Sequence, residues 1–104
     1  FLPQELQRGA DGAMTGFAYP EMLVEVVKLH KQGNIDEAED LFDAYLPLVR
    51  YEQQPGLGLA IRKETLHRRG VIDSPKARDP GPSLSGEDNA ELTRIIERVK
   101  ENLK

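Results

Sequence analysis

The sequence predicts a mainly α-helical chain, and two features of its apolar pattern indicate this. One apolar stripe near the end of the chain has helical spacing with polar residues behind it, and consists of Leu92, Ile95, Ile96, Val99 and Leu103. Upstream, residues 20–51 hold two helical patterns joined by Gly33-Asn34, which is typical of an antiparallel helical hairpin. Only residues 13–16 are candidates for a strand, and that run is short.

Length and composition fit one small domain or a piece of a larger protein, with 104 residues of which 38% are hydrophobic. The net charge of −4 gives no general attraction to nucleic acid, and no apolar run reaches the ~20 residues of a membrane span. The absence of cysteine excludes disulfides and thiolate chemistry and is compatible with the cytoplasm, where we expect the protein. Because the sequence begins with Phe1, without an initiator Met or a signal peptide, we expect it to belong to a longer parent chain.

The first third of the chain is predicted to form a helix, a strand and a second helix. Pro3 suits the first turn of a helix that Gly9 ends. Residues 13–15, which lie between Gly12 and Gly16, are predicted as a short buried strand. A proline followed by an acid begins a helix over residues 20–32, and Gly33 ends it.

The remaining residues, 34–104, are predicted to form three helices. Asn34 is expected to cap the first of these, with Glu37 at the reciprocal position of a capping box. Its apolar face continues to Val49, and Pro47 should kink or end it because proline lacks the amide hydrogen.

Turn and cap signals set the bounds of the last two helices. The pattern predicts a helix over residues 57–69, closed by Gly70 after a basic last turn. The proline-rich residues 73–83 are predicted as an extended connector on the surface. Ser85, with Asp88 three residues later, then caps the final helix.

No catalytic or metal-binding constellation emerges from residue types alone. His30 and His67 are isolated, and we expect no metal and no cofactor. A basic cluster on the helix predicted at residues 57–69 is best interpreted as a solvated face, although a nucleic-acid or phosphate patch is an alternative; it consists of Arg62, Lys63, His67, Arg68 and Arg69. A second alternative is a self-contained interaction module that binds a partner helix through residues 35–49 or 92–103.

Several short motifs occur in a specific order along nearly the whole chain. They are Gly9-Ala10-Asp11-Gly12-Ala13-Met14-Thr15-Gly16, the helix stop at Gly33, Leu46-Pro47-Leu48, Arg69-Gly70-Val71-Ile72 and the crossing Arg78-Asp79-Pro80-Gly81-Pro82. Each motif is weak alone, but the order resembles the carboxy-terminal part of the dihydrodipicolinate synthase / N-acetylneuraminate lyase family.

The resemblance implies that the chain is part of a (β/α)₈ TIM barrel with a helical extension. Residues 1–33 would be the end of the barrel, with the last strand at about 13–16 and the last helix at about 20–32. Residues 34–104 would be the three-helix extension. Barrel active sites lie at the carboxyl ends of the strands, so the residues implied to line the substrate cavity are Thr15, Gly16, Phe17 and Ala18.

The family implies a class I lyase, in which a lysine amine forms a Schiff base with a 2-keto acid. The substrate would be pyruvate or a 2-keto-3-deoxy sugar acid, and the reaction aldol cleavage, condensation or dehydration; the motifs look most like the sugar-acid dehydratases and aldolases. The family's lysine, tyrosine and Gly-Thr-Thr loop lie on earlier strands, and neither Lys28, Lys31 nor Lys63 follows a strand.

We therefore expect no catalytic residue in this segment and no lyase activity from it alone. Its expected partners are the rest of the barrel or further copies in a homo-oligomer, with no role for nucleic acid or a membrane. Separation from a barrel should leave an apolar face of the helix at 20–32 exposed and the strand at 13–16 unpaired.

Overall fold

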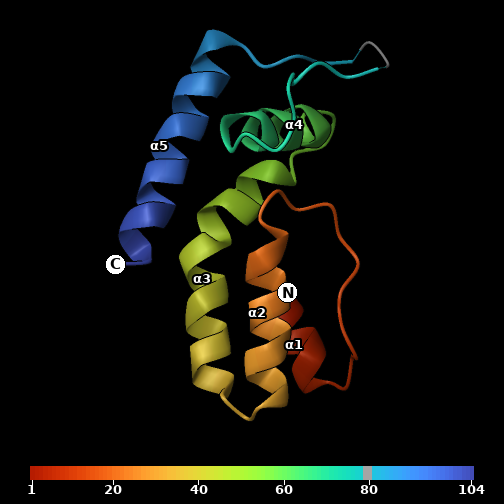
Figure 1. Ribbon diagram of the computed structural model, residues 1–104, viewed down its shortest axis with the longest axis vertical. Coiled ribbons are helices and arrows are strands. Elements are labelled where there is room, and N and C mark those ends of the chain that lie inside the picture. The colour runs from red at the N-terminus through yellow and green to blue at the C-terminus, as the bar shows by residue number, and fades with distance from the viewer. Residues whose placement is uncertain (79–80) are drawn as a thin grey trace.

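The structure is a computed structural model that describes residues 1–78 and 81–104, so Asp79 and Pro80 of the predicted crossing lie outside the described residues. Five helices occur in those ranges: α1 (Leu2–Gln7), α2 (Pro20–Lys31), α3 (Ile35–Glu52), α4 (Gly58–Arg68) and α5 (Gly86–Asn102). Figure 1 shows α2 and α3 running antiparallel, with α1 beside α2, α5 beside α3 and α4 across the end of α3. The helices predicted from the sequence are confirmed.

Helix α3 is the centre of the fold, because it packs against each of the other four helices. The core around it is aliphatic, with two phenylalanines, as expected from a sequence without tryptophan. Its buried members come from all five helices and from the segment before α2, and they are Leu2, Leu6, Phe17, Met22, Val26, Ala38, Phe42, Leu48, Ile61, Leu92 and Val99.

The turn between α2 and α3 is formed by Gly33, whose φ of +84° is a left-handed conformation that glycine adopts without steric cost. The amide of Asn34 donates to the Leu29 carbonyl at 2.9 Å and closes the end of α2. The predicted capping box of Asn34 and Glu37 is wrong, because the Asn34 side chain makes no cap hydrogen bond. The tight turn leaves Asn34 at ψ +64°, away from the extended backbone that side-chain caps use.

Pro47 lies inside α3, and the helix continues past it to Glu52. Figure 1 shows the helix bending in its last turns toward α4, in agreement with a kink rather than an end. The two leucines beside the proline have opposite environments: Leu48 is fully buried, whereas Leu46 is 42% exposed.

Helices α4 and α5 pack against α3 and complete the fold. A Cβ on Gly58, the first residue of α4, would lie 2.6 Å from the Glu52 carbonyl oxygen, so glycine permits this close approach to α3. The capping box of α5 is confirmed, since Ser85 and Asp88 exchange hydrogen bonds of 2.9 and 3.0 Å. Leu92 and Val99 of its stripe are buried, so much of that stripe is used inside the chain.

Residues 10–18 carry no helix, and no strand occurs among the residues that the structure describes. The strand predicted at 13–16 is therefore not formed in this chain. A strand requires a neighbouring strand for its backbone hydrogen bonds, and no described segment supplies one. Met14, in the middle of the segment, is fully exposed. Figure 1 shows the segment running along the open side of α1 and α2.

The apolar face of α2 is largely covered, contrary to the expectation that it would be exposed. Met22 and Val26 are buried, because α1 and α3 both pack against α2 within the chain. Val24 is the exception and is 67% exposed. The open apolar positions near the predicted strand are thus few.

Candidate functional site

A buried carboxylate lies at the end of α3, where the apolar face of this helix meets the segment before α2. Glu52 continues the helical spacing of that face, which runs through Ala38, Phe42, Tyr45 and Val49. Its side chain is only 3% exposed. A charged residue at an apolar position of a helix is the sequence signal for this site, and the sequence interpretation did not use it.

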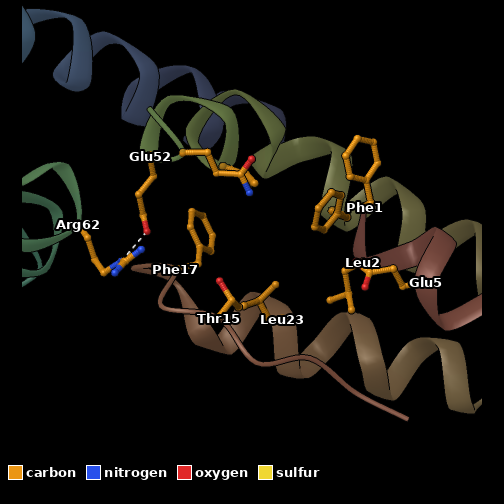
Figure 2. A pocket seen from close by; sticks show the side chains of 11 residues that line it. Phe1, Leu2, Glu5, Thr15, Phe17, Leu23, Glu52 and Arg62 are labelled. Carbon is orange, nitrogen blue, oxygen red and sulfur yellow. Dashed lines mark hydrogen bonds and ion pairs between the residues drawn. The ribbon is translucent and has the colours of Figure 1, made fainter. Parts of the chain in front are cut away.

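Both oxygens of the Glu52 carboxylate have partners from other parts of the chain. The Arg62 Nε of α4 donates to Oε1 at 2.8 Å, and the backbone amide of Ala18 donates to Oε2 at 3.2 Å. Figure 2 shows the ion pair as a dashed line between the two helices. Glu52 therefore joins α3, α4 and the residues that lead into α2.

Burial raises the pKa of Glu52, because a carboxylate loses favourable hydration when it leaves water. The hydrogen bonds from Arg62 and Ala18 favour the charged form and oppose this rise only in part. The two partners thus make a buried charge tolerable, and the loss of either would leave an uncompensated group.

A second cation, Arg69, holds the other side of the same backbone. It donates through Nη1 to the Ala18 carbonyl, and its Nη2 lies 2.8 Å from Oε1 of Glu21 in the first turn of α2. Its guanidinium also lies 4.1 Å from the centre of the Tyr19 ring, which is a cation–π contact. Arg69, a member of the basic cluster, therefore joins the end of α4 to the start of α2.

A cavity of about 190 Å³ opens beside the Glu52–Arg62 pair. Figure 2 shows Thr15 and Phe17 on one side of it and the ion pair at one end. Its other lining residues come from α1, α2 and α3 and include Leu2, Glu5, Leu23, Phe42 and Val49. The cavity wall is thus both apolar and polar, and its polar groups include the Thr15 hydroxyl, the Glu5 carboxylate and the Glu52–Arg62 ion pair.

The four predicted cavity residues have different surroundings. Thr15 and Phe17 line this cavity, whereas Gly16 packs against Arg62, since a Cβ on it would lie 2.7 Å from the guanidinium carbon. Ala18 is fully buried between Glu52 and Arg69 and does not line the cavity. Whether these residues face a substrate in a complete barrel stays a prediction.

The basic cluster of α4 is largely committed to contacts within the chain. Besides Arg62 and Arg69, Arg68 donates to the Thr93 hydroxyl at 2.8 Å and so joins α4 to α5. Lys63 donates to the Lys76 carbonyl at 3.3 Å. Within residues 1–78 and 81–104, no group of three or more His, Cys, Asp or Glu residues is placed to hold a metal ion, and no helix could cross a membrane.

Comparisons with known proteins confirm the resemblance inferred from the motifs. Over 94% of its length the chain matches, as a helical segment, the carboxy-terminal part of proteins of the dihydrodipicolinate synthase family. One match is a crystal structure of dihydrodipicolinate synthase from Rhodopseudomonas palustris, with a TM-score of 0.91 and 52% sequence identity. The match covers 94% of this chain and 33% of the chain in that crystal structure.

A second relative is L-2-keto-3-deoxyarabonate dehydratase from Azospirillum brasilense. It is 34% identical over 98 residues, which are 94% of this chain and 31% of that protein. The chain therefore spans about one third of the length of both relatives. No family model matches it.

Proposed function

We propose that this chain is the carboxy-terminal portion of a class I, Schiff-base lyase that acts on a 2-keto acid. The observation that carries the proposal is the match of 94% of the chain to a segment of each of two relatives. One is named as a dihydrodipicolinate synthase and the other as a dehydratase of a 2-keto-3-deoxy sugar acid. The proposed substrate is therefore pyruvate or a 2-keto-3-deoxy sugar acid, used in aldol cleavage, condensation or dehydration.

The proposed place of this chain in the enzyme follows the division at Gly33. Residues 1–33 would end the barrel, with its last strand at about 13–16 and its last helix at α2, and residues 34–104 would be the appended helices. Two observations support this: Met14 is fully exposed, and residues 13–16 form no hydrogen bonds through their amides to described residues. A neighbouring barrel strand would cover the Met14 side chain and accept hydrogen bonds from these amides.

The proposed chemistry begins when a lysine amine attacks the keto carbon of the substrate and water leaves, which gives an imine. The imine withdraws electrons, so that a nearby C–C or C–O bond is made or broken. We assign the amine to the part of the parent protein outside this chain. The contribution of this segment would be a wall of the substrate cavity, formed around Thr15 and Phe17.

The proposed setting is a cytoplasmic enzyme whose partners are the rest of its barrel and further copies of itself. The absence of cysteine is compatible with a reducing compartment. No cofactor is required by the proposed chemistry, because the lysine amine and the substrate keto group supply the reacting atoms.

Borohydride reduction in the presence of pyruvate tests this proposal, because hydride converts the imine to a stable secondary amine. With the full-length protein that contains this chain, we expect a covalent adduct on a lysine outside residues 1–104. With the 104-residue chain we expect none. Mass spectrometry of peptides locates the adduct. An adduct on Lys28, Lys31 or Lys63, or none in the full-length protein, would contradict the proposal.

A further inference from the structure

The peptide groups of Ala18 are held from both sides by charged side chains of the appended helices. Glu52 of α3 accepts a hydrogen bond from the Ala18 amide at 3.2 Å, and Arg69, the residue after α4, donates to its carbonyl. Ala18 is fully buried, so water cannot replace either partner. The backbone at this point is therefore fixed by the extension rather than by its own segment.

The ion pair between Glu52 and Arg62 also restrains the backbone at Gly16, two residues before Ala18. Arg62 is held by Glu52, and its guanidinium lies against Gly16, where a Cβ would approach Cζ to 2.7 Å. Thr15, the preceding residue, lines the cavity beside the ion pair. Figure 2 shows Phe17 and Thr15 at the end of the cavity where the Glu52–Arg62 pair lies, away from Phe1, Leu2 and Glu5. Because Thr15 is bonded directly to Gly16, a displacement of the Arg62 guanidinium would therefore shift the position of Thr15.

We propose that Glu52, together with Arg62, is a positioning residue that orients Thr15 against the substrate of the lyase, an inference that rests on the function proposed above. Both carboxylate oxygens are occupied by Arg62 and Ala18, so Glu52 acts through the backbone and not on the substrate. Because the reacting amine lies elsewhere, the pair affects how substrate fits the cavity wall more than it affects imine formation.

Glu52→Gln is the sharpest test of this role, because it preserves size and removes one acceptor. In glutamine one of the two carboxylate oxygens is replaced by an amide nitrogen that only donates, so the separate bonds from Arg62 to Oε1 and from Ala18 to Oε2 cannot both persist in place. One of the two donors then loses its partner, and the segment at Gly16 moves. Glu101→Gln is the matched control, since Glu101 of α5 forms an exposed ion pair with Lys104, which follows the helix.

The experiment measures steady-state kinetics and borohydride trapping in the full-length protein that contains this chain. Glu52→Gln is expected to raise KM for the 2-keto acid about 3- to 10-fold, the effect of losing one hydrogen bond. We expect kcat to change by less than about 2-fold and the imine adduct to be retained. Glu101→Gln should leave both constants unchanged.

A double variant separates positioning from a general loss of structure. Thr15→Val should raise KM as Glu52→Gln does, and the double variant should do no more than either single change, because both act through the same contact. Gly16→Ala displaces the Arg62 guanidinium without changing Glu52, and the same rise in KM is expected. If Glu52→Gln does not fold, Gly16→Ala tests the same positioning role.

The outcomes distinguish the two proposals. An adduct in the wild type and an unchanged KM in Glu52→Gln and Gly16→Ala would overturn the positioning role and leave the lyase intact. Effects of Glu52→Gln and Thr15→Val that multiply in the double variant would also overturn it, since they would be independent. Absence of an adduct in the wild type would overturn the lyase function and this inference with it.

Discussion

Leu48→Ala is expected to lower the free energy of unfolding of this chain by about 2–5 kcal/mol. Leu48 is fully buried in α3, the helix that packs against each of the others. Truncation removes apolar contacts and leaves a cavity that the surrounding helices cannot fill completely. Urea denaturation is followed by far-UV circular dichroism, which reports helix content. It measures the change in the urea midpoint of unfolding.

Leu46→Ala is the matched control, because Leu46 lies on the other side of Pro47 in the same helix and is 42% exposed. The change in residue type and in helix propensity is the same for both variants. We expect Leu46→Ala to cost less than about 1 kcal/mol. Equal losses in the two variants would contradict the burial of Leu48 in the core and the exposure of Leu46.

Arg62→Met is expected to cost about 2 kcal/mol at neutral pH, because the Glu52 carboxylate keeps its burial and loses its ion-pair partner. The estimate is below that for a fully buried pair, since the Arg62 side chain is 34% exposed and water replaces part of the interaction. Methionine preserves most of the apolar length of arginine, so the change tests the charge. Thermal and urea unfolding measure it.

The cost of Arg62→Met should depend on pH in a defined direction. Burial already holds the folded-state pKa of Glu52 above the ordinary value of 4.5, and loss of Arg62 raises the pKa further. Between the unfolded and folded pKa values the folded state binds more protons, so stability falls as pH rises through that window. The window extends to higher pH in the variant. The difference from wild type should therefore be smallest near pH 4 and grow toward neutrality.

Lys104→Met is the control for this prediction, because it breaks an ion pair whose two side chains are both about 70% exposed. Exposed pairs contribute little, so its unfolding midpoint should stay within error of wild type at each pH. A loss in Arg62→Met that is independent of pH would show that the carboxylate of Glu52 is not the group left without a partner.

The helices could be predicted from the sequence because their signals are local. Ser85 and Asp88 form the expected capping box, and Gly33 and Gly70 adopt the positive φ that ends a helix. The capping box at Asn34 was wrong because the left-handed Gly33 fixes the backbone that precedes α3. A neighbouring residue with a stronger conformational demand overrode the cap signal.

The strand at 13–16 could not form from local sequence, because a strand depends on partners that no described part of this chain provides. The motif order nevertheless identified the family, since motif order does not require the rest of the barrel.

The candidate site was predicted only in part, because its contacts join residues far apart in the sequence. Thr15 and Phe17 were named from the resemblance, and both line the cavity. Glu52 was missed, although its place on an apolar helix face is a visible anomaly. Its partners Ala18 and Arg62 lie 34 and 10 residues away, and only the folded chain brings them together.

Amide hydrogen exchange at Met14, Thr15 and Gly16 decides whether this segment is a barrel strand separated from its neighbours. In the 104-residue chain we expect these amides to exchange freely, whereas the Ala18 amide, bonded to Glu52, should be protected. In the full-length protein that contains this chain, pairing with adjacent strands should protect all four. Free exchange at Met14, Thr15 and Gly16 in that protein would contradict their assignment to a barrel strand.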